Sequence, residues 1–311
     1  MVARGTMRVH RAGRWQDRGV TTRLLGLLLA LVALTGCGVR LDSPDPVPSS
    51  PDAAEVVRQR EALRARQFAA VEPEGEHADL VAAVATHASA QLDALGGVWV
   101  AWPAGDGPTP TADATADVVI GPGAAGLLDS LTATTPDVAA AALAGGDPEI
   151  ATLYAAIATA RTVDADRLAV ALGTPGAVTP LPGSLDTPDP AVARALDAAA
   201  YRLETLAARE RAADAAAEAE RFVARAGEFR SLAEGIVAAN GWLGTAADPR
   251  EPYYPVTEDD AATLHRDLAV LLVAAVGDSD DRAGMLDAAL SCALEASRRG
   301  QEIGALPGLA S

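Results

Sequence analysis

Histidine can take more chemical roles than the other residue types of this chain, and the 311 residues contain four histidines. His87 projects to the apolar side of a predicted helix, with Gln91 one turn later. In that place a histidine could serve as a metal ligand or a general base. We expect a core histidine bonded to a carbonyl oxygen or to Gln91, because no cysteine or acid has matching spacing. We expect His265 on a helix surface.

One Glu-x-x-His pattern, from Glu74 to His77, offers a carboxylate and an imidazole. It lies where a helix begins, so we expect a hydrated helix N-terminus whose acids favour the dipole, with a loop metal site as the alternative. The chain has no lysine, which excludes the Ser-x-x-Lys nucleophile motif. It also has no Gly-x-Ser-x-Gly nucleophile motif. The glycine-rich residues 121–126 lack the lysine of a phosphate-binding loop. We therefore predict no catalytic, cofactor-binding or metal-binding residue, and no enzyme.

The first 36 residues are typical of a bacterial lipoprotein signal peptide. They begin with six arginines: Arg4, Arg8, Arg11, Arg14, Arg18 and Arg23. Residues 24–34 then form an apolar run that is too short to span a bilayer as a helix. The run ends in Leu34-Thr35-Gly36-Cys37, which resembles the lipobox cleaved by signal peptidase II. The resemblance implies lipidation of the Cys37 thiol and cleavage before it, with an uncleaved anchor as the alternative.

The charge of the chain changes sign after residue 36. Residues 1–36 carry six arginines and one aspartate, and the rest carries 19 arginines against 41 acidic residues. Such an acidic body disfavours a nucleic-acid partner.

Residues 37–52 are proline-rich, and we expect a disordered tether there. We expect the protein on the extracytoplasmic face of the cell membrane, with membrane lipid as its partner through Cys37 and no protein partner indicated. Cys292 then lacks an intramolecular disulfide partner and is expected to be a small buried residue.

The alanine-rich, aromatic-poor composition predicts an all-α fold in two parts. We expect a separate N-terminal helical module at 53–173 and a Pro/Gly-rich linker at 174–188, with packing of these helices onto the C-terminal bundle as the alternative. Trp99 and Trp102 fall in an expected loop and should cover a domain edge, with an exposed binding tip as the alternative. The expected helices of the module are 53–68, 77–95, 123–133, 136–144, 148–161 and 164–172. Residues 189–311 show four amphipathic stripes, at about 190–214, 216–240, 257–275 and 281–300, which predict a four-helix bundle.

The last part of the chain also resembles a known family. The residues that carry the resemblance are Tyr253-Tyr254-Pro255-Val256-Thr257, the two helices that follow, and Ala305-Leu306-Pro307-Gly308-Leu309. They are similar to an actinobacterial family of uncharacterised ferritin-like domains, and the similarity covers residues 189–311. The resemblance implies a ferritin-like four-helix bundle and no established activity.

A ferritin-like bundle can hold two metal ions when it supplies glutamates on two helices and Glu-x-x-His on the other two. His265 is the one histidine of residues 189–311, and Ala262 stands where the glutamate is required. We expect Glu210, near the apolar stripe of its helix, to pair with an arginine instead. The chain is therefore predicted to be a non-catalytic scaffold or binding module. The alternatives are a metal-binding ferritin relative with unorthodox ligands and a binder of a small apolar ligand between helices.

Overall fold

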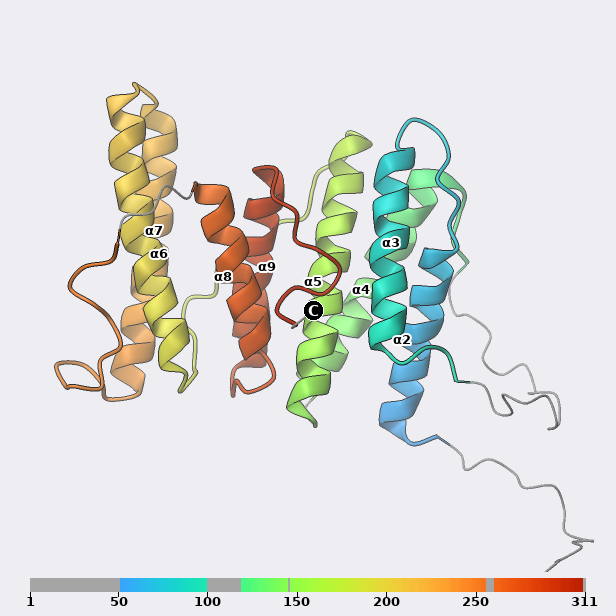
Figure 1. Ribbon diagram of the computed structural model, residues 1–311, viewed down its shortest axis with the longest axis horizontal. Coiled ribbons are helices and arrows are strands. Elements are labelled where there is room, and N and C mark those ends of the chain that lie inside the picture. Colours follow the sequence, from blue (N-terminus) through green and yellow to red (C-terminus); the bar gives the residue numbers. More distant parts are fainter. Residues whose placement is uncertain (1–50, 100–118, 145, 256–259, 310–311) are drawn as a thin grey trace, which may run out of the picture. The chain divides into compact units, whose positions relative to one another are not determined.

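The computed structural model describes residues 51–99, 119–144, 146–255 and 260–309, and all the regular elements in these ranges are helices (Figure 1). The all-α prediction is therefore confirmed. The helices are α2 (Ala53–Ala69), α3 (Ala78–Ala94), α4 (Gly123–Leu143), α5 (Pro148–Ala171), α6 (Pro190–Ala212), α7 (Ala216–Ala239), α8 (Ala261–Ala275) and α9 (Arg282–Arg298). None of them has the length and apolarity that a membrane span requires. The predicted signal peptide and Cys37 lie outside the described residues.

Aspartate side chains begin many of these helices. Each accepts a backbone N–H of the first turn, which satisfies a donor that has no partner inside the helix. The capping residues are Asp52, Asp147, Asp189, Asp260 and Asp281. The cap predicted at Asp189 is confirmed, with Pro190 at the first helical position. α8 begins later than the predicted Thr257, because Asp260 is its N-cap.

Two helices of the first half are longer than predicted. The helices expected at 123–133 and 136–144 are one helix, α4, which continues through Pro136. The hydroxyls of Thr134 and Thr135 each donate to the carbonyl oxygen four residues earlier, at 2.8 and 2.7 Å, in the turn that Pro136 disturbs. α5 also continues without a break, because its polar residues Arg161 and Asp164 are buried among neighbouring helices. Buried polar residues interrupted the apolar pattern in the sequence but not the helix.

Consecutive helices form antiparallel pairs, and α8 and α9 lie between the α6–α7 pair and α5 (Figure 1). α2 contacts α3, α4 contacts α5, α6 contacts α7 and α8 contacts α9. α8 also contacts α6, and α5 also contacts α3, α8 and α9. The Pro/Gly-rich residues 174–188 contain no helix and connect α5 to α6. α5 therefore joins the α2–α3 pair to the α8–α9 pair, and α8 joins the α8–α9 pair to the α6–α7 pair.

The main hydrophobic core is shared by helices from before and after residues 174–188. It contains Ile157 of α5, Leu196 of α6, Phe229 of α7 and Leu272 of α8, all fully buried. Alanine fills many of the other core positions, and short side chains allow helix axes to approach closely. A smaller cluster of α2 to α5 is formed by Phe68, Val81, Val84, Ala88, Leu127, Leu131 and Leu168. The described residues between 51 and 309 belong to one compact unit.

Candidate functional site

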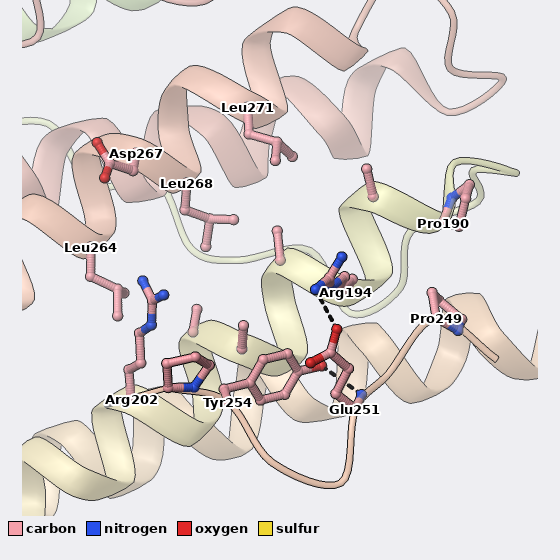
Figure 2. Close-up of a pocket in the computed structure, with 15 residues that line it drawn as sticks. Pro190, Arg194, Arg202, Pro249, Glu251, Tyr254, Leu264, Asp267, Leu268 and Leu271 are labelled. Atoms are coloured by element: carbon pink, nitrogen blue, oxygen red, sulfur yellow. Dashed lines mark hydrogen bonds and ion pairs between the residues drawn. The ribbon is translucent and has the colours of Figure 1, made fainter. Parts of the chain in front are cut away.

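A cleft of about 650 Å³ lies between α6 and α8 (Figure 2). α8 supplies Leu264, Leu268 and Leu271, whose spacings of four and three place them on one helix face. α6 supplies small side chains: Ala191, Ala195, Ala198 and Ala199. Because an alanine side chain ends at Cβ, the two helices can touch through their other residues and still leave space here. The cleft is thus an apolar groove whose floor is alanine and whose wall is leucine.

Residues 249–255, from the connection between α7 and α8, form a further wall of the cleft. The hydroxyl of Tyr254 donates to Asp197 of α6 at 2.9 Å and accepts the N–H of Glu251 at 3.0 Å. Glu251 also forms an ion pair with Arg194 of α6 (Figure 2). Burial raises the pKa of Tyr254 to about 12, so its hydroxyl is neutral at physiological pH. These contacts attach the wall to α6.

The charges around the cleft are balanced. Arg194 and Arg202 lie on α6, Glu251 on the connecting wall and Asp267 on α8. Among the described residues that line the cleft there is no histidine, cysteine, serine or threonine. The arrangement can hold an apolar molecule and hydrogen-bond a polar group at its edge, but it presents no activated nucleophile.

A buried polar network joins α2, α3 and α5. Glu61 is fully buried and accepts hydrogen bonds from Arg161 at 2.7 Å and from Arg64 at 2.8 Å. Arg161 also donates to Gln91 at 3.1 Å, and its guanidinium lies 5.3 Å from the centre of the Phe68 ring. Burial lowers the pKa of Arg161, and the Glu61 carboxylate opposes that shift. The network stabilises the packing of three helices around one carboxylate.

His87 is buried as predicted, but the predicted hydrogen-bond partner is wrong. Its Nδ1 lies 3.0 Å from the carboxylate of Asp164 on α5, which is 3% exposed. Gln91, one turn later, bonds to Arg161 and to the carbonyl of Ala305 instead. The hydrogen bond to Asp164 raises the pKa of His87. Asp164 is 77 residues away in the chain, so helix spacing could not identify it.

The prediction that His265 lies on a helix surface is wrong. Its side chain is 1% exposed, because α8 packs against α5, α6 and α9 and has little free surface. Its Nδ1 lies 2.6 Å from the carbonyl oxygen of Ala261, and its ring centre lies 5.8 Å from that of Phe229. Burial lowers the pKa of His265 to about 4, so the ring is neutral at physiological pH.

The remaining predicted residues are spread over the fold. Cys292 is fully buried, as expected, and burial raises the pKa of its thiol to about 12. Glu74 is exposed, and His77 is the N-cap residue of α3, which agrees with a hydrated helix N-terminus. Trp99 is 54% exposed rather than tucked against the core, and Trp102 lies outside the described residues.

The glutamates considered for metal binding do not converge. Glu204 is exposed and pairs with Arg230. Glu210 is half-buried, and the arginine partner predicted for it is not found among the described residues. Within the described ranges no three His, Cys, Asp or Glu side chains are arranged to hold a metal ion.

The sequence prediction identified none of the cleft residues as a site. The available signal was the row of alanines on α6 beside its buried stripe, together with the prolines and tyrosines of residues 249–255. None of the protein families, curated proteins and solved structures that were compared with the chain matches it. The class that the fold and the cleft define is therefore an all-helical protein with an apolar inter-helix cleft.

Proposed function

We propose that the protein is a lipid-anchored, non-catalytic binding module of the cell envelope that holds a small apolar ligand in the α6–α8 cleft. The observation that carries this proposal is the leucine and alanine lining of that cleft. Ligand sites in proteins are concave, mostly apolar and supplied with a few polar groups that orient the ligand. Tyr254 and the Arg194–Glu251 pair are the polar groups in this case.

The same proposal places residues 189–311 with the ferritin-like domains that their sequence resembles. Two features support it. α6 to α9 form two antiparallel pairs, and the connection between α7 and α8 is the longest of the three that join them. A ferritin-like bundle likewise has one long connection among short ones. In this proposal the bundle serves as a scaffold for the cleft rather than for a metal centre.

Ligand binding is tested with a neutral apolar fluorophore, N-phenyl-1-naphthylamine, and by native mass spectrometry of the purified protein. The test variant is Ala198→Leu, because Ala198 is half-buried and lines the cleft. The added isobutyl group occupies the space that the ligand requires. We expect binding of the fluorophore to weaken at least about tenfold, or ~1.4 kcal/mol.

The matched control is Ala208→Leu, which adds the same group to an exposed position of the same helix. It should bind the fluorophore as the unmodified protein does, and circular dichroism should give both variants the same helix content. Equal binding by the two variants would place the ligand elsewhere. If the unmodified protein shows no saturable binding of the fluorophore, the proposal that the cleft holds an apolar ligand is wrong.

The lipid anchor is tested by metabolic labelling with a fatty acid in the producing cell. Label should be incorporated into the protein and should disappear in Cys37→Ser, since the thiol is the proposed acceptor. Cys292→Ser provides the control, because Cys292 is buried and should not influence labelling. Persistent label in Cys37→Ser would contradict the anchor without affecting the cleft.

A further inference from the structure

Residues 300–309 follow α9 and form a C-terminal strap (Figure 1), whose residues contact α8. Gln301 donates to the hydroxyl of Thr263 at 3.1 Å. Gly308 has φ +81° and lies so close to α8 that an added Cβ would be 2.8 Å from the carbonyl oxygen of Val270. Only glycine fits this contact without displacement, so the end of the strap is closely docked on α8.

The strap also contacts α3, through two side chains that are one helical turn apart. Gln91 donates to the carbonyl oxygen of Ala305 at 3.3 Å. Nε2 of His87 lies 3.9 Å from a carboxylate oxygen of Glu302, and Nδ1 lies 3.0 Å from Asp164. The imidazole thus stands between a buried carboxylate of α5 and an exposed carboxylate of the strap.

The charges that face His87 come from α5 and from the strap. Asp164 and Glu302 favour the protonated ring, and Arg167 of α5 opposes it. Arg161, also on α5, interacts electrostatically with Asp164. The hydrogen bond to Asp164 is the largest of these effects, and together they raise the pKa of His87 above its ordinary value of 6.5.

We propose that the C-terminal strap is a proton-controlled clasp, in which protonated His87 holds Glu302 against α3 and loss of the proton releases Glu302, at the start of the strap. Protonated imidazole carries an N–H on both nitrogens, so it can donate to Asp164 and attract Glu302 at the same time. Neutral imidazole keeps its Nδ1–H on Asp164 and presents the lone pair of Nε2 to the Glu302 carboxylate. The attraction to Glu302 is then lost, while the contacts of the strap with α8 remain.

The sign of the effect follows from the raised pKa of His87. The clasp is closed at acidic pH, where the ring is charged in the folded state, and it opens as the pH rises above 6.5 and through the raised pKa. Protonation of His265 does not interfere in this range, since its pKa is about 4.

The clasp is tested by nuclear magnetic resonance of the purified protein between pH 5.5 and 9. The imidazole signal of His87 gives its titration midpoint, and the ¹⁵N heteronuclear NOE of Glu302 reports fast motion at the start of the strap. We expect the NOE to fall as the pH rises, with the midpoint of His87. In His87→Gln it should be low at every pH, because glutamine is uncharged throughout.

Two further variants separate the clasp from a general loss of structure. Glu302 is 79% exposed at its side chain, so Glu302→Gln should fold normally, keep a mobile strap at all pH values and lower the pKa of His87. His77→Gln changes a histidine just before the same helix and should retain the pH dependence of the unmodified protein. An NOE that is constant from pH 5.5 to 9, or a pH dependence that survives in Glu302→Gln, would overturn the clasp.

Discussion

Replacement of Glu61 by glutamine is expected to destabilise the protein strongly. Glu61 is fully buried and is the shared acceptor of Arg161 and Arg64, whose side chains are 1% and 4% exposed. Glutamine keeps the shape of the side chain but removes the charge that balances both guanidinium groups. Loss of one partner from a buried ion pair costs about 3–5 kcal/mol, because the remaining charge stays in a poorly solvated place. We expect Glu61→Gln to lower the free energy of unfolding by an amount in that range.

The measurement is urea unfolding followed by circular dichroism. The matched control is Glu55→Gln, the same change on the same helix, where the carboxylate is 34% exposed and pairs with Arg58. A surface pair of this kind contributes about 1 kcal/mol or less. The double variant Glu61→Leu with Arg161→Met removes both charges and should recover most of the loss, since Arg64 retains Asp137 at 2.8 Å. If Glu61→Gln costs no more than Glu55→Gln, the network is hydrated and the reasoning fails.

Three further outcomes are expected. As the pH falls from 6.5 to about 4, unfolded chains take up a proton that folded His265 does not, so the free energy of unfolding should fall by about 3 kcal/mol through this group. His265→Leu should lose that part of the acid sensitivity, as measured by urea unfolding at several pH values. Phe229→Ala should cost about 3–5 kcal/mol because the ring is fully buried, whereas the half-exposed Val223→Ala should change stability little. Cys292 should react with a thiol reagent only when the protein unfolds, since its thiol is buried with a pKa of about 12; rapid reaction of the folded protein would contradict this burial.

The sequence predicted helices well where apolar spacing was regular and caps were present. α6, α7 and α9 lie within two residues of their predicted limits, and Asp189 begins α6 as expected. The predictions were wrong where polar residues turned inward. Arg161 and Asp164 made α5 look like two short helices, although each is buried and bonded to another helix. Spacing along one helix carries no information about a partner contributed by another.

From the sequence, the type of site could be predicted for the candidate cleft, but its residues could not. A binder of an apolar ligand between helices was one alternative from the sequence, but no residue could be assigned to it. A row of alanines on α6 can mean close packing against a neighbour or an open groove. The difference depends on where α8 and residues 249–255 lie, which is set by contacts such as that between Tyr254 and Asp197.

The position of α5 has a consequence for the order in which the protein can mature. α5 contacts α3 and α4, which precede or adjoin it in the chain, and also α8 and α9, which are made last. α9 buries residues along most of its length, from Gly284 to Ala296. A growing chain therefore cannot complete its core until the final helix has been synthesised. The contacts of α5 with α8 and α9 thus form only after the whole chain has been made, so the last helix acts as the closing element of the core.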